Sequence, residues 1–166
     1  MRKFKITVFI AIFLLQAIVS NAQEKATPQE VVQKVREASE FLSKTGDEGL
    51  KEFMDKNGRW VWKDTYIFIA NCSAQSLAAH PIKPKFVGKK LGMGFKDVNG
   101  KLFFAEYCTI VESFGKGWVE YMWAKVGEKT PSRKITYVMQ VPGTSYQAGA
   151  GIYNETISIE ELNKLK

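Results

Sequence analysis

Histidine and cysteine are scarce in this chain, which has one histidine and two cysteines among 166 residues. A closed zinc site takes four ligands, mostly from these two residue types, and c-type haem attachment takes a Cys-x-x-Cys-His motif that the sequence lacks. We therefore expect no metal, haem or other cofactor.

The sequence also lacks blocks of like charge and nucleotide-binding motifs. Its formal net charge of +7 includes Arg2, Lys3 and Lys5, and the later lysines alternate with apolar and acidic residues. No basic stripe is available to follow a phosphate backbone, so nucleic acid is not an expected partner. The glycines between residues 88 and 94 lack the Gly-Lys-Ser/Thr ending of a phosphate-binding loop.

The uncharged run at residues 6–19 is shorter than the roughly 20 apolar residues of a membrane-spanning helix. It follows basic residues and ends at Ser20-Asn21-Ala22, whose small side chains suit signal peptidase. This pattern predicts a signal peptide at 1–22, cleaved between Ala22 and Gln23, and one periplasmic or secreted domain at 23–166. The alternative is an uncleaved membrane anchor.

The two cysteines, Cys72 and Cys108, follow this predicted export signal, and disulfides persist outside the cytoplasm. One disulfide and two partly buried free thiols are both compatible with the sequence. Spacing alone does not show whether their Cα atoms come close enough to be bridged.

The first half of the predicted domain has helical periodicity. Apolar residues recur at three- and four-residue steps over 28–44, and Thr27 with Glu30 forms a capping-box pattern before them. A shorter helix is predicted at 47–56, ended by the turn at Asn57-Gly58.

The remainder is rich in strand formers. We predict strands at 66–70, 77–80, 118–126, 134–141 and 148–153, with a helix at 102–114 and a short terminal helix near Glu160. Polar loops with proline or glycine join the last three strands, as in antiparallel hairpins. This order predicts an α+β fold with one antiparallel sheet.

Six short motifs, in this order, make the chain resemble the single Cache domain of extracellular bacterial receptors. They are Ala79-His80-Pro81, Gly88-Lys89-Lys90-Leu91, Asp97-Val98-Asn99-Gly100, Gly117-Trp118-Val119-Glu120-Tyr121, Lys134-Ile135-Thr136-Tyr137-Val138 and Gly149-Ala150-Gly151-Ile152-Tyr153. The resemblance implies a PAS-like antiparallel sheet, with the long N-terminal helix packed on one face and a small pocket on the other. Such domains recognise short organic acids, amino acids and similar metabolites, usually in chemoreceptors or histidine kinases.

The resemblance places five candidate ligand-binding residues near that pocket: His80, Tyr121, Trp123, Lys134 and Tyr137. Tyr121 and Trp123 alternate onto one strand face and offer apolar walls with polar tips. An inward Lys134 calls for an anionic partner, and His80 and Tyr137 offer hydrogen-bond donors. Tyr66 and Tyr107 are alternative hydroxyl donors, because the sequence does not fix which way they face. The plainer alternatives are a turn histidine beside Pro81 and a solvated edge lysine.

We therefore expect an exported sensor module that binds a small carboxylate-bearing molecule. No Gly-x-Ser-x-Gly elbow or other catalytic constellation is legible, so an enzyme is not expected. The rival hypothesis is an interaction module without a ligand of its own, which docks on a separate membrane sensor or pairs with a second copy. An exposed apolar strip along Val31, Val35 and Leu42 would favour that rival.

Overall fold

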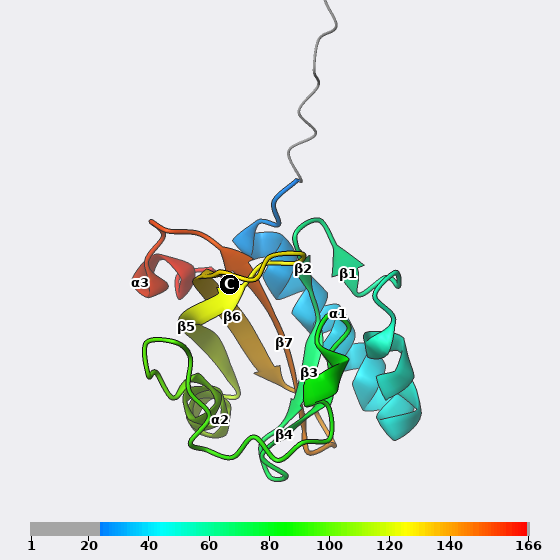
Figure 1. Cartoon of the computed structure of the whole chain (residues 1–166). Helices are drawn as coiled ribbons and strands as arrows, with labels where there is room; N and C mark the ends of the chain where they lie inside the picture. Colours follow the sequence, from blue (N-terminus) through cyan, green and yellow to red (C-terminus); the bar gives the residue numbers. More distant parts are fainter. Residues whose placement is uncertain (1–23, 166) are drawn as a thin grey trace, which may run out of the picture.

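The computed structural model describes residues 24–165 (Figure 1). The predicted signal peptide and its cleavage site lie outside the described residues. Within them, no helix has the length and apolar character needed to cross a membrane. The elements are α1 (Pro28–Thr45), η1 (Gly46–Met54), β1 (Val61–Trp62), β2 (Thr65–Tyr66), β3 (Phe68–Asn71), β4 (Ser76–Ala79), η2 (Pro84–Phe86), α2 (Phe103–Phe114), β5 (Lys116–Ala124), β6 (Pro131–Gln140), β7 (Tyr146–Tyr153) and α3 (Ile159–Leu162).

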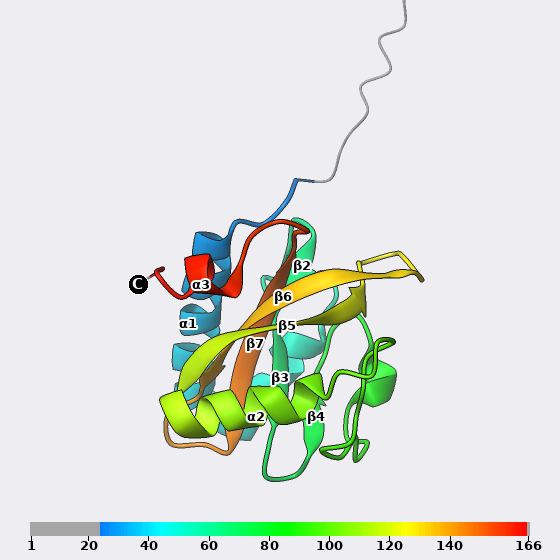
Figure 2. The ribbon, with the colours of Figure 1, turned by 90° about the vertical axis from the view of Figure 1, so that its left-hand side faces the viewer.

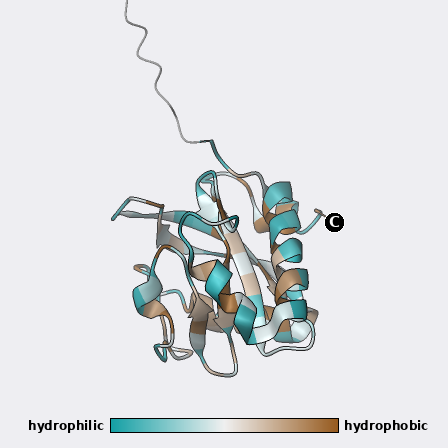
Figure 3. Cartoon of the chain, turned by 90° about the vertical axis from the view of Figure 1, so that its right-hand side faces the viewer, coloured by the Kyte–Doolittle hydropathy of each residue, from teal (hydrophilic) through white to brown (hydrophobic). Residues whose placement is uncertain are grey.

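Helix α1 begins at the predicted capping box, in which Thr27 Oγ1 accepts from the Glu30 N–H and the Glu30 carboxylate accepts from the Thr27 N–H. Val31, Val35 and Leu42 are fully buried where the helix packs on β6 and β7. Hydrophilic and hydrophobic segments alternate along its ribbon in Figure 3, as one buried face requires. The exposed apolar strip that would favour the interaction hypothesis is therefore not present on α1.

The second helix is a 3₁₀ helix, η1, that follows α1 directly at Gly46, whose φ is 55°. The strand predicted at 66–70 is divided between β2 and β3. The division lies at Ile67, whose N–H donates to the Trp60 carbonyl instead of continuing the main sheet. The small β1–β2 hairpin was not predicted.

Five antiparallel strands form the main sheet in the order β4-β3-β7-β6-β5. The three long strands occur where the sequence predicts them, with boundaries shifted by a few residues. Figure 1 shows the sheet between α1 and α2, and Figure 2 shows α2 in front of the lower part of the sheet. Helix α2 packs on β5 and, to a lesser extent, on β6. The expected α+β fold, with the long helix on one face, is confirmed.

The sheet separates two apolar cores because neighbouring residues of a strand face opposite sides. Trp118, Ile135 and Tyr137 pack in the core under α1, whereas Val119 and Tyr121 pack in the core under α2. The segment 80–102 is mostly irregular and contributes Ile82, Phe86, Leu91 and Phe95 to the second core. The candidate site lies in this second core.

Candidate ligand-binding site

An aromatic cavity lies between the sheet, α2 and the segment 80–102. Its lining residues are Tyr66, Phe68, Leu77, His80, Phe86, Leu91, Phe95, Phe103, Phe104, Tyr107, Tyr121 and Trp123. The free volume is about 20 Å³, enough for about one water molecule. A metabolite therefore enters only if some of these side chains move.

Strand β5 and helix α2 build one wall of the cavity. The rings of Phe103 and Tyr121 stack with centroids 4.3 Å apart, and Tyr107 meets Tyr121 edge to face at 5.6 Å. Trp123 Nε1 donates to the Tyr66 hydroxyl at 3.1 Å, which connects this wall to β2. Tyr121 and Trp123 therefore both line the cavity, as the sequence indicates.

His80 lines the cavity from the end of β4 and is 3% exposed. Its Nδ1 accepts from the N–H groups of Ile82 and Lys83, at 3.3 and 3.0 Å, so the proton of the neutral ring is on Nε2. Burial, with the charges of Lys134 and Lys83, lowers the pKa of His80 to about 3. The ring is thus a neutral hydrogen-bond donor. Its two bonds to backbone N–H groups also stabilise the turn beside Pro81, as expected of a turn histidine.

Lys134 is fully buried on β6, in register with Tyr121 on β5 and Tyr153 on β7. Its Nζ has no hydrogen-bond partner among residues 24–165 and lies 4.2 Å from the centre of the Tyr66 ring. Burial lowers the pKa of Lys134 to about 7, against an opposing effect of Asp64. The solvated-edge alternative for this residue does not hold.

Lys134 is not among the residues that border the free space. Its Nζ lies over the ring of Tyr66, and Tyr66 does border this space. The Tyr107 hydroxyl, which is also buried, forms no hydrogen bond of ordinary geometry within the described residues, although the Tyr121 hydroxyl is close enough to affect its pKa. The site thus holds a buried amine and a buried hydroxyl with unused donor capacity.

Tyr137 does not belong with the other four predicted residues. Its ring packs against Trp118 at 5.1 Å in the core under α1, on the opposite face of the sheet. Its neighbour Thr136 faces the site instead, and its Oγ1 donates to the Tyr121 hydroxyl at 3.1 Å. The placement of Tyr137 is corrected because an odd spacing from Lys134 reverses the strand face.

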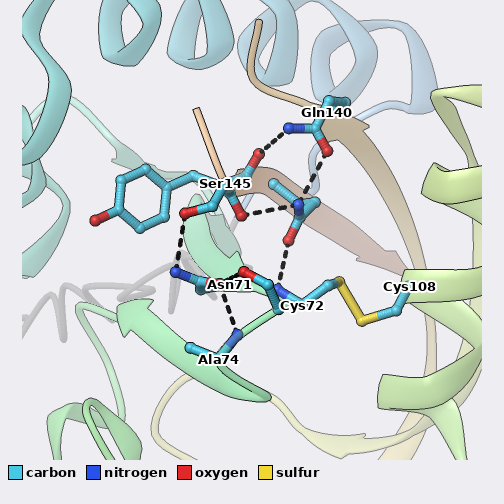
Figure 4. Close-up of a disulfide and its surroundings, with 9 residues drawn as sticks. Asn71, Cys72, Ala74, Cys108, Gln140 and Ser145 are labelled. Atoms are coloured by element: carbon cyan, nitrogen blue, oxygen red, sulfur yellow. Dashed lines mark hydrogen bonds between the residues drawn. A yellow bond between two sulfur atoms is a disulfide. The ribbon is translucent and has the colours of Figure 1, made fainter. Parts of the chain in front are cut away.

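A disulfide between Cys72 and Cys108 answers the question that the sequence left open (Figure 4). Their Cα atoms are 5.6 Å apart, and the bridge joins the turn after β3 to α2. The turn is held further by the Cys72 N–H, which donates to Gln147 Oε1 at 2.9 Å, and by Asn71, which donates to Ser145. The bridge therefore holds the α2 wall of the cavity against the sheet.

The segment 80–102 closes the cavity and carries many lysines. Its Gly88 and Leu91 N–H groups donate to carbonyls of Leu77 and Gln75, which joins it to β4 and the preceding turn. Asp97 accepts from three backbone N–H groups, including that of Met122 on β5. Exposed lysines lie at 85, 89, 90 and 96.

In the part of the chain that the structure describes, no three histidine, cysteine or acidic residues are grouped to hold a metal ion. The arrangement offers donors and one buried cation, with aromatic walls around them. Groups of this kind can bind a small anion.

Solved structures of sensor domains resemble this fold. The periplasmic sensor domain of a chemotaxis protein has a TM-score of 0.60 and 26% identity, covering 77% of this chain and 90% of that chain. A Cache chemosensory domain, studied for the structural basis of its carboxylic acid recognition, has a TM-score of 0.58 and 28% identity, covering 75% and 81%. These neighbours confirm the expected PAS-like Cache fold.

A curated relative is the methyl-accepting chemotaxis protein McpP of Pseudomonas putida. It is 26% identical over 103 residues, which make up 62% of this chain and 19% of the relative. The chain thus spans about a fifth of that receptor's length. A model of the Cache domain matches residues 14–165, which include the whole described structure. The chain belongs to the Cache domain family.

Proposed function

We propose that this domain is a sensor module that binds a short-chain monocarboxylate in the aromatic cavity, with Lys134 as the counter-charge. The observation that carries the proposal is the Lys134 amine, which is fully buried and has no hydrogen-bond partner. A buried charge is costly unless it is paired, and a carboxylate would pair it. The solved relative studied for carboxylic acid recognition supports the same ligand class.

The composition of the site favours one negative charge and an apolar tail. Aromatic and aliphatic side chains dominate the lining, and no aspartate or glutamate belongs to it. Asp64 is the acidic residue whose charge acts on Lys134, and its carboxylate already accepts a hydrogen bond from the Ala26 N–H at 2.8 Å. An amino acid would therefore bury its ammonium without a partner.

The ligand site we propose consists of Lys134, Tyr107, Tyr121, Trp123 and His80. Entry of the ligand widens the cavity by displacing the Tyr66 ring, so that the carboxylate reaches Lys134 Nζ. The hydroxyl of Tyr107 and the Nε2–H of His80 add neutral donors, and the rings of Tyr121 and Trp123 enclose the tail.

We also propose that residues 23–166 act as one domain outside the cytoplasm, in a sensor and not a catalytic role. The Cys72–Cys108 disulfide and the periplasmic structural neighbour support this location. Joining of the domain to a membrane receptor is the arrangement that its chemoreceptor relatives suggest.

A binding experiment on the purified domain tests the proposal. Acetate, propionate and butyrate, with propionamide, alanine and succinate as comparisons, are screened by thermal shift, because a ligand of the folded state raises the melting temperature. Calorimetry then gives affinities for the best acid. We expect binding of the monocarboxylates and none of propionamide.

Two pairs of variants locate the site. Lys134→Met should weaken binding by roughly ten- to a hundredfold, the effect of losing a hydrogen bond to a charged group, whereas Lys116→Met on the surface should not. Tyr107→Phe should weaken binding, and Tyr137→Phe, on the other face of the sheet, should not. Equal effects within either pair, or the absence of any carboxylate ligand, would refute the proposal.

A further inference from the structure

The surroundings of Lys134 contain no group that can permanently neutralise an ammonium. Tyr121 on β5 and Tyr153 on β7 flank it in register, and Tyr66 on β2 presents its ring face to Nζ. The Tyr153 hydroxyl already donates to the Ala124 carbonyl at 2.8 Å, and its ring centre lies 5.4 Å from Nζ.

The charged and titratable groups on the remaining elements do not supply a counterion either. Asp64, between β1 and β2, favours the ammonium by its field but forms no ion pair with it. Lys83, after β4, opposes the ammonium, and His80 is a neutral ring on the same side. Aromatic faces are therefore the main stabilisation available to the charge in the ligand-free domain.

Glycine at 151 shows that the fold makes room for this buried stem. A Cβ at Gly151 would lie 2.7 Å from Lys134 Cε and 2.5 Å from Thr136 Oγ1. The lysine stem thus occupies space that a side chain on β7 would otherwise take. Because the amine is fully buried and has no hydrogen-bond partner among the described residues, its charge depends on what binds beside it.

We propose that the site takes up a proton together with its carboxylate, so that this domain responds jointly to the acid and to pH. The inference rests on the carboxylate-binding function proposed above and deepens it. At a pH above the pKa of the free amine, the ligand-free site holds the amine mainly in its neutral form, and the bound anion recruits the proton that makes the ammonium. The carboxylate and the proton that the site takes up together have the composition of the undissociated acid, but in the complex the proton is on the lysine amine.

The direction of the linkage follows from the change in the lysine pKa. In the free domain burial lowers the pKa of Lys134 to about 7, and a carboxylate in contact with Nζ raises it. The bound state therefore holds more protons than the free state above about pH 7, and affinity falls as pH rises. Below about pH 6 the amine is already protonated and affinity becomes constant.

The expected size of the effect is large enough to measure. Between pH 6.5 and 8.5 the dissociation constant for propionate should rise about 25-fold, because the protonated fraction of free Lys134 falls by that factor. Binding at pH 8 should take up nearly one proton, whereas binding at pH 6 should take up almost none.

Calorimetry of propionate binding to the oxidised domain tests the inference. Titrations at pH 6, 7, 8 and 9, each in two buffers of different ionisation enthalpy, give the affinity and the number of protons taken up. Lys134→Met should bind weakly with no uptake and no pH dependence. Lys116→Met, which alters an exposed lysine, should behave as the wild type.

The outcomes separate this inference from the proposed function. Propionate that binds equally well at all four pH values, without proton uptake, would overturn the inference and leave the carboxylate site standing. Absence of binding by any monocarboxylate at pH 6 would overturn both. Should Lys134→Met not fold, the wild-type pH series alone still decides the question.

Discussion

Lys134 should make the stability of the ligand-free domain rise between pH 7 and pH 9, which is unusual for a lysine. The folded-state pKa is about 7, and an unfolded lysine titrates near 10.4. Between these values the unfolded chain binds a proton that the folded chain does not. The unfolding free energy therefore increases with pH across this interval.

The magnitude follows from the two pKa values. The difference between a folded-state pKa of about 7 and the ordinary lysine value lowers the unfolding free energy by on the order of 4 kcal/mol when both states are protonated. About 2 kcal/mol of this loss is recovered between pH 7 and 9. For a domain of this size that is a rise in melting temperature of roughly 6 °C.

The other buried groups with shifted pKa values change the stability outside the interval from pH 7 to 9. The pKa of His80 is lowered to about 3, so its unfolded form takes up a proton only below about pH 6.5, where stability falls with falling pH. Burial raises the pKa values of Tyr66 and Tyr153, so stability falls only when unfolded tyrosines ionise above about pH 10.

Urea unfolding at pH 7, 8 and 9, followed by circular dichroism without ligand, measures the effect. Lys134→Met should be more stable than the wild type at pH 7 by a few kcal/mol and should show a flat profile between pH 7 and 9. The exposed-lysine control Lys116→Met should keep the wild-type slope. A flat wild-type profile would show that Lys134 keeps an ordinary lysine pKa in the folded domain, and the reasoning about its burial would be wrong.

Three further perturbations have definite expected results. Replacing Cys72 and Cys108 together by serine should lower the unfolding free energy by about 4 kcal/mol, since the bridge closes a 36-residue separation; urea unfolding checks it. Gly151→Ala places a Cβ within 2.8 Å of three atoms and should cost roughly 1–3 kcal/mol, whereas Gly94→Ala meets open space and should be near neutral by the same assay. Changing the lysines at 85, 89 and 90 to glutamine should reduce the salt dependence of propionate association, measured by NMR line shapes at 20 and 300 mM salt.

The fold is predictable from the sequence wherever a local pattern and the tertiary packing agree. Helix α1 has a capping box, periodic apolar residues and a closing glycine, and the structure has it at Pro28–Thr45. The division at Ile67 was not predictable, because a run of apolar strand formers does not show which backbone groups pair with Trp60 and which with β7.

The site shows a sharper contrast. Tyr121, Trp123 and His80 line the cavity, and Lys134 lies just beyond it, in agreement with their motifs. The sequence was sufficient to exclude Tyr137 from the site, because it is three residues from Lys134 on the same strand and therefore faces the opposite side of the sheet. The walls contributed by α2 and the segment 80–102, such as Phe103 and Phe95, depend on long-range packing that no local pattern shows.

The position of Lys134 is difficult to explain by stability alone. A penalty on the order of 4 kcal/mol is a large part of the 5–15 kcal/mol by which domains are usually stable, and a hydrophobic side chain in its place would remove that penalty. Gly151 leaves space for the lysine stem, and the tyrosines around it present ring faces to the amine, so the neighbouring residues accommodate this cost. A carboxylate that pairs with the amine relieves the penalty only when bound. Under the carboxylate-binding function proposed above, the free energy that destabilises the empty domain becomes affinity for an anion. A buried, unpaired lysine is for that reason more informative about function than any of the aromatic residues around it.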